Sequence, residues 1–149
     1  MMDLGIAGKT AIVCGSSRGL GRACAQSLAR AGCKVLVNGI DPDRLATTAT
    51  DIREETGSEI IEVAGDVTTH VGQDALFEKC DAPDILITNA GGPPFRDFRE
   101  LERDAMLNGV TWNMITPIEL IQHYIDGICL LYTSPSPRDL STSRMPSSA

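Results

Sequence analysis

The chain has 149 residues, a formal net charge of −7, 42% hydrophobic residues and 4% aromatic residues. This length suits one domain, and an acidic chain whose Lys and Arg residues are scattered argues against a nucleic-acid partner. No apolar run approaches the roughly 20 residues needed to cross a bilayer, and the N-terminus lacks the apolar segment of a signal peptide, so we expect no membrane partner.

The first predicted elements surround a glycine-rich turn. Residues 10–13 are typical of a strand, and Gly15, Gly19 and Gly21 follow with the spacing G-x-x-x-G-x-G. A helix comes next, ended by Gly32, and residues 33–37 read as a second strand. The residues expected on the buried face of this helix are Leu20, Ala23, Cys24, Ser27, Leu28 and Ala31. A glycine turn that enters a helix offers free backbone N–H groups and the positive end of the helix dipole, so this βαβ unit predicts a phosphate site.

The next segment predicts a capped helix. Asp41 is expected to cap it, Pro42 to be its first residue and Gly57 to end it. Its buried stripe is predicted from Leu45, Ala49 and Ile52.

Two more strands and two more helices follow. Residues 59–64 and 84–88 read as strands, residues 73–80 as a short helix, and residues 101–128 as a long helix with Pro117 as the candidate point for a bend. Pro93 and Pro94 predict a loop before that helix.

This alternation predicts a Rossmann-type, doubly wound parallel α/β sheet of strands one to four in the order 3-2-1-4. The glycine turn, Asp66 and residues 89–91 then meet at the carboxyl ends of the strands, where such sheets bind ligands.

The five cysteines contain no C-x-x-C pair, and the two histidines are isolated. We interpret the cysteines as small buried thiols in a reducing compartment, which favours a cytoplasmic location, and we expect no metal site.

Four motifs resemble those of the short-chain dehydrogenase/reductase family over residues 6–128. Residues 14–21 resemble T-G-x-x-x-G-x-G, with Cys in place of Thr, and residues 88–91 resemble N-N-A-G, with Thr in place of the first Asn. Asp66 and Val67 resemble the D-V pair that follows strand three, and Asn113 resembles the asparagine of the long helix. The overall appearance is similar to the branch of 3-oxoacyl-carrier-protein reductases.

The resemblance implies roles for these residues. The Asp66 carboxylate would accept a hydrogen bond from the adenine amino group, and Asn113 would help to hold a proton-relay water, as its catalytic part. The implied cofactor-binding residues are Gly15, Ser16, Ser17, Arg18, Gly19, Leu20, Gly21, Asn38, Asp66, Val67, Asn89, Ala90 and Gly91. Simpler roles stay open: turn formation for Asp66 and Asn89, a polar helix position for Asn113, and a solvated charge for Arg18.

The cofactor predicted is NADP rather than NAD. Residues 38–40, at the end of strand two, lack the carboxylate that holds the ribose hydroxyls in NAD-preferring members, and Arg18 resembles the arginine of NADP-preferring members. Ile40, however, stands where such members often have a second arginine.

The family's later catalytic residues do not occur in this sequence. The family uses a Ser and then Tyr-x-x-x-Lys, whereas the tyrosines here are Tyr124 and Tyr132 and the last lysine is Lys79. From Cys129 the sequence becomes rich in Ser and Pro, and it matches what a transposase-type sequencing adapter would encode. We therefore interpret 1–128 as the dinucleotide-binding half of a domain and 129–149 as a disordered, artefactual tail, and we expect this chain alone to be inactive and poorly stable.

The function predicted is that of an oxidoreductase which transfers a hydride between NADP(H) and a small carbonyl or secondary alcohol substrate. The resemblance also implies a homo-oligomer for the full-length form, paired through the long helix. The alternatives are a non-catalytic dinucleotide-binding module and a different nucleotide-binding α/β domain, such as one that uses S-adenosylmethionine.

Overall fold

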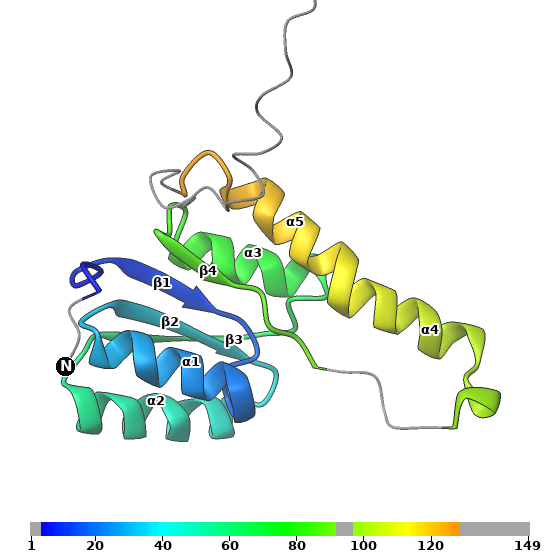
Figure 1. Ribbon diagram of the computed structural model, residues 1–149, viewed down its shortest axis with the longest axis horizontal. Helices are drawn as coiled ribbons and strands as arrows, with labels where there is room; N and C mark the ends of the chain where they lie inside the picture. Colours follow the sequence, from blue (N-terminus) through cyan, green and yellow to red (C-terminus); the bar gives the residue numbers. More distant parts are fainter. Residues whose placement is uncertain (1–3, 92–96, 129–149) are drawn as a thin grey trace, which may run out of the picture.

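A four-stranded parallel sheet forms the centre of the protein (Figure 1). The structure, a computed structural model, describes residues 4–91 and 97–128; the predicted loop at Pro93 and Pro94 and the predicted tail 129–149 lie outside these residues. The strands are β1 (Thr10–Val13), β2 (Lys34–Gly39), β3 (Ile60–Ala64) and β4 (Ile85–Ile87), in the order β3-β2-β1-β4. The predicted Rossmann-type α/β fold and its strand order are therefore confirmed.

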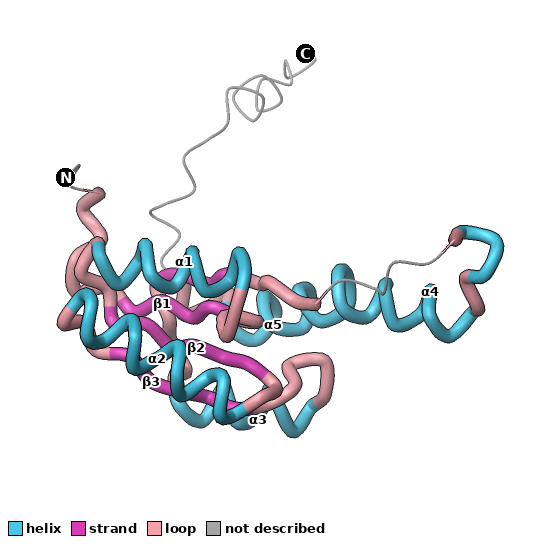
Figure 2. The backbone as a smooth tube through the Cα atoms, turned by 90° about the horizontal axis from the view of Figure 1, so that it is seen from below, coloured by secondary structure: helices cyan, strands magenta, loops and turns pink. Residues whose placement is uncertain are grey.

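Helices cover both faces of the sheet (Figures 1 and 2). On one face, α1 (Gly19–Arg30) and α2 (Pro42–Thr56) pack on a core that includes Ala11, Val13 and Val35. On the other face, α3 (His70–Lys79) and α5 (Thr116–Tyr124) pack on a core that includes Ile12 and Leu36. Successive strand residues thus face opposite cores, and both sides of each central strand are apolar because both are buried.

The predicted buried face of α1 is wrong in part. Leu20, Ala23 and Ser27 are exposed, and the fully buried positions are Gly21, Ala25 and Ala29. Cys24 and Leu28 are partly buried against the core, as predicted, and Ala31 is also only partly buried. The helix lies so close to the sheet that its smallest residues face the strands, and the larger side chains flank the contact.

The predicted α2 is confirmed in detail. The Asp41 carboxylate accepts the N–H of Arg44, Pro42 starts the helix, and Gly57 ends it at a φ of 70°. Leu45, Ala49 and Ile52 are buried as predicted, together with Thr48.

Two boundaries of the predicted strands and the short helix differ from the structure by two residues or more. β2 continues through Asn38 and Gly39, because these residues pair with Val63 and Ala64 of β3. α3 begins at His70 rather than residue 73, because the Thr69 hydroxyl accepts the N–H of Gly72 and so caps an earlier first turn.

The long C-terminal helix is interrupted. After a 3₁₀ turn, η1 (Phe98–Glu100), it consists of α4 (Arg103–Val110), a π-helical segment η2 (Thr111–Ile115) and α5. Pro117 is the second residue after η2 and has no N–H to donate to the preceding turn, so the wider helical turn lies where the regular pattern of helical hydrogen bonds would be broken. In both views α4 extends beyond the edge of the sheet (Figures 1 and 2). No helix of the described residues is both long and apolar enough for a membrane span.

Candidate dinucleotide site

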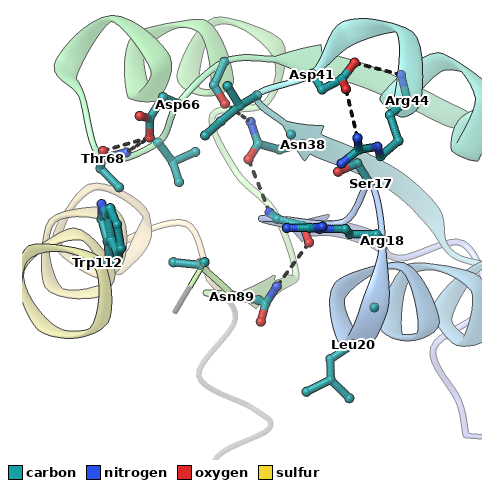
Figure 3. Close-up of a pocket in the computed structure, with 18 residues that line it drawn as sticks. Ser17, Arg18, Leu20, Asn38, Asp41, Arg44, Asp66, Thr68, Asn89 and Trp112 are labelled. Atoms are coloured by element: carbon teal, nitrogen blue, oxygen red, sulfur yellow. Dashed lines mark hydrogen bonds and ion pairs between the residues drawn. The ribbon is translucent and has the colours of Figure 1, made fainter. Parts of the chain in front are cut away.

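A pocket of about 480 Å³ lies at the carboxyl ends of the strands (Figure 3). The segments that line it are the glycine turn, the β2–α2 junction, the loop after β3, the segment after β4, and one helical turn of η2. The lining residues are Gly15, Ser17, Arg18, Gly19, Leu20, Asn38, Gly39, Ile40, Asp41, Arg44, Gly65, Asp66, Val67, Thr68, Asn89, Ala90, Gly91 and Trp112. The volume falls within the range of small-molecule and cofactor sites.

The glycine turn is held by contacts that leave no room for a side chain at Gly15 or Gly21. A Cβ atom on Gly21 would lie 2.3 Å from the carbonyl oxygen of Gly15. Gly15 has a φ of 57°, and a Cβ atom there would lie 2.8 Å from the Asn89 amide nitrogen. The Asn89 amide donates to the Gly15 carbonyl oxygen at 3.1 Å, so the segment after β4 fixes the turn. Asn89 thus has a structural role as well as a place in the pocket wall.

The first turn of α1 faces this pocket without a cap. Arg18 is the N-cap residue, but its side chain makes no capping hydrogen bond, and the first turn contains no acidic residue. The N–H of Arg22 is the first to find a helical partner, the Arg18 carbonyl at 3.3 Å. The preceding N–H groups, together with the helix dipole, could therefore receive an anion.

Two polar residues next to the turn hold the neighbouring backbone in place. The buried Ser16 hydroxyl donates to Val13 O at 2.8 Å and accepts the N–H of Asn38 at 2.9 Å. The Asn38 side-chain amide donates to Val63 O and Gly65 O, at 3.0 and 3.1 Å, while its oxygen accepts the N–H of Gly15 at 3.4 Å. These contacts join β2, the end of β3 and the glycine turn, and they use the N–H and O–H donors of both side chains.

Asp66 forms a tight turn at the far end of the pocket. One carboxylate oxygen, Oδ1, accepts both the N–H of Thr68, at 3.0 Å, and its hydroxyl, at 2.8 Å. Asp66 thus forms the turn that its simpler role required. Its second oxygen, Oδ2, still has acceptor capacity. Trp112 lies on the same side of the pocket (Figure 3), and Val67 also lines it.

Most predicted cofactor-binding residues come together in this pocket. Ser16 and Gly21 lie behind the turn rather than in the lining, and Asn113 is exposed, with its amide donating to the Gly109 carbonyl of its own helix at 2.9 Å. Sequence reasoning missed Thr68, Trp112 and Arg44 as pocket residues. Trp112 immediately precedes Asn113. Plotting the residues around Asn113 on a helical wheel could have identified Trp112 as the one that faces the pocket.

Tyr124 lies in the core rather than in the pocket. It is fully buried, makes an edge contact with the ring of Phe77 at 5.3 Å, and its hydroxyl has no hydrogen-bond partner among the described residues. Burial raises the pKa of this hydroxyl above its ordinary value. Tyr124 therefore does not supply a proton to a ligand in the pocket.

The remaining titratable side chains form no metal site in the described ranges. Over residues 4–91 and 97–128, no three His, Cys, Asp or Glu side chains come together as a set that could hold a metal ion. Burial raises the pKa of the Cys14 thiol to about 12, so this residue is a core side chain in its protonated form.

Comparison with known proteins agrees with this geometry. The family model for short chain dehydrogenases matches residues 9–129. An uncharacterized oxidoreductase, YvaG of Bacillus subtilis, is 29% identical over 128 residues, which are 85% of this chain and 48% of that protein. The L-rhamnose 1-dehydrogenase (NAD(P)(+)) of Azotobacter vinelandii is 34% identical over 113 residues, which are 71% of this chain and 44% of that protein.

A solved structure gives the same fold. The L-sorbose reductase of Gluconobacter frateurii, complexed with NADPH and L-sorbose, superposes with a TM-score of 0.80 at 31% identity, over 85% of this chain and 50% of that chain. The chain thus spans about half the length of the relatives it matches.

Proposed function

Because the chain belongs to the short-chain dehydrogenase family, we propose that residues 1–128 are the cofactor half of an oxidoreductase that transfers a hydride between NADP(H) and a small carbonyl or secondary alcohol. The observation that carries this proposal is the uncapped first turn of α1, which shares one pocket with the glycine turn and Arg18. In this arrangement the backbone N–H groups receive the diphosphate, and Arg18 adds a positive charge beside them.

The end of β2 supports NADP over NAD. Asn38, the last residue but one of β2, uses its whole amide on the backbone of neighbouring segments. A Cβ atom on Gly39 would lie 3.1 Å from the Ser17 side chain, so an acidic side chain at position 39 would be in close contact with Ser17. Residues 38 and 39 therefore offer no acidic partner for the ribose hydroxyls. The Asp41 carboxylate in the lining is used in the cap of α2, and Arg18 supplies a positive charge instead.

The opposite end of the pocket suits an adenine ring. The Asp66 carboxylate has acceptor capacity for an exocyclic amino group, and Val67 and Trp112 provide apolar surface for the flat ring. When bound, the nicotinamide cofactor supplies or takes up the hydride. Asn113 would hold a proton-relay water through the amide oxygen and the second N–H, which its bond to the Gly109 carbonyl does not use.

The family assignment extends to partners as proposals. The relatives' printed activities indicate a small-molecule substrate. The α4–η2–α5 rod exposes a series of large apolar side chains, which supports a homo-oligomer of the full-length form. These side chains are Met106, Leu107, Val110, Met114, Ile115, Ile118 and Ile121, followed by Ile125 at the C-cap of α5. The free thiols of Cys14 and Cys33, both buried, fit the proposed cytoplasmic location.

A second candidate is a dinucleotide-binding module without catalysis. The sequence contains no Tyr-x-x-x-K, and Tyr124 lies in the core. On this basis we propose that the 149-residue chain by itself binds the cofactor without turnover.

The test is a titration of the chain with NADPH, NADH and S-adenosylmethionine. Trp112 is the single tryptophan and lines the pocket, so its fluorescence reports NADPH and NADH binding, while calorimetry reports S-adenosylmethionine. One charge-assisted contact to the extra phosphate is worth about 1.5 kcal/mol, so NADPH should bind about tenfold more tightly than NADH. Tighter binding of S-adenosylmethionine, or no binding of either dinucleotide, would contradict the proposal.

A further inference from the structure

The β2–α2 junction brings a second arginine to the pocket, at a position that sequence comparison with the family did not indicate. Ile40 stands where NADP-preferring members often have an arginine, yet its apolar side chain is 72% exposed and offers no charge. Arg44, in the first turn of α2, lines the same pocket as Arg18. These two arginines are the cationic side chains of the described lining.

A carboxylate holds the Arg44 side chain at this place. Asp41 Oδ1 accepts the backbone N–H of Arg44 at 3.1 Å, and Asp41 Oδ2 lies 3.3 Å from Arg44 Nη2 (Figure 3). Both side chains are about half exposed, at 50% for Arg44 and 46% for Asp41. Because solvent screens such a pair, its strength is small, and the guanidinium can exchange the carboxylate for a more highly charged partner.

Other arginines near α2 are engaged elsewhere. Arg22 pairs with Asp51 at 2.8 Å, and Arg53 pairs with Glu62 at 2.8 Å. Neither lines the pocket. Arg44 is therefore the side chain of α2 that can add positive charge to the pocket.

We propose that Arg44 is a specificity-determining residue that contacts the 2′-phosphate of the adenosine ribose, in exchange for its ion pair with Asp41. This inference rests on the proposed function and deepens it. A phosphate dianion attracts the planar guanidinium more strongly than one carboxylate does and accepts two of its N–H groups. Asp41 then acts in two ways: its cap positions the first turn of α2, and its charge opposes the incoming phosphate.

The experiment measures the dissociation constants of NADPH and NADH for the chain and three variants. R44Q should weaken NADPH binding by about tenfold and change NADH binding by less than twofold, since one charge-assisted contact is lost. D41N should strengthen NADPH binding about threefold, because asparagine keeps the cap but removes the opposing charge. R22Q is the matched control: Arg22 is an ion-paired arginine outside the pocket, so the ratio of the two constants should not change.

The outcomes separate the two proposals. If the unchanged chain binds neither dinucleotide, the proposed function fails. If it binds both and R44Q leaves the NADPH-to-NADH ratio unchanged, the role of Arg44 is overturned while the proposed function stands. A loss of NADPH affinity in D41N would contradict the exchange of partners.

A measurement without any variant guards against a folding defect. The Arg44 Nε resonance of the labelled chain should shift on addition of 2′-AMP and not on addition of 5′-AMP at equal saturation. No difference between the two nucleotides would overturn the proposal.

Discussion

Replacing Asn38 by alanine should destabilise the protein by about 3 kcal/mol, although the residue lies beside a ligand pocket and not at the centre of an apolar core. The change removes two donations, to Val63 O at 3.0 Å and Gly65 O at 3.1 Å, and one longer acceptance from the N–H of Gly15 at 3.4 Å. A hydrogen bond contributes about 1 kcal/mol net, and a buried partner left unsatisfied costs about 1–3 kcal/mol. The backbone N–H of Asn38 keeps its bond to the Ser16 hydroxyl, so the loss is confined to the side chain.

The assay is urea unfolding followed by circular dichroism, in a constant background of TMAO that keeps the unchanged chain folded. With a slope of about 2 kcal/mol/M, a loss of 3 kcal/mol lowers the midpoint by about 1.5 M. The matched control is Asn113→Ala, because that exposed amide bonds only within its own helix turn, at Gly109; its free energy of unfolding should stay within about 0.5 kcal/mol of the unchanged chain. A change of less than about 0.5 kcal/mol in Asn38→Ala would refute the reasoning that this amide joins β2, β3 and the glycine turn.

Three further predictions concern the glycine turn, the Asp84 carboxylate with its partners Lys9 and Thr10, and the Cys14 thiol. Gly21→Ala should abolish dinucleotide binding in the fluorescence titration, because its Cβ would lie 2.3 Å from Gly15 O; Gly109→Ala, where nothing lies within 4 Å, should bind normally and gain up to about 1 kcal/mol of helix stability. The Thr10 N–H and the Lys9 ammonium hold the pKa of Asp84 below its ordinary value of 3.8, so its contribution is present above that value and lost as pH falls through the lower folded pKa. The free-energy gap between the unchanged chain and Asp84→Asn should therefore be full at about pH 6 and narrow as the pH falls below 3.8, and a gap independent of pH would count against this pair. Because burial raises the pKa of Cys14 to about 12, a thiol reagent followed by mass spectrometry should label Cys24 before Cys14, and the reverse order would show that the β1 end opens.

The sequence predicts the fold well because local signals and the global fold agree. The same α/β arrangement is indicated by the cap at Asp41, by the left-handed glycine at Gly57 and by the alternation of strands with helices along the chain. The strand order follows because parallel connections are right-handed and short, which leaves few topologies to choose from. The glycine turn, Asp66 and Asn89 reach one pocket for the same reason, since each follows the carboxyl end of a strand.

What the sequence does not predict depends on how closely elements approach. The buried face of α1 is wrong in part because apolar spacing indicates large residues such as Leu20, while the contact with Gly15 requires Gly21. Hydrogen bonding beneath the turn likewise decides that Ser16 and Asn38 are structural. Arg44 and Trp112 line the pocket because of the direction in which their helical turns point them. Their distance along the sequence from the motifs does not reveal that direction.

The central claim is that the pocket at the strand ends holds a phosphorylated dinucleotide over the glycine turn. An amide ¹H–¹⁵N correlation spectrum of the labelled chain, recorded with and without NADPH, tests it most directly. We expect the largest shifts at Gly19, Leu20 and Gly21, whose N–H groups belong to the first turn of α1, and at Asp66 and Val67, where we place the adenine. Shifts confined to other residues, or none at saturating NADPH, would contradict it.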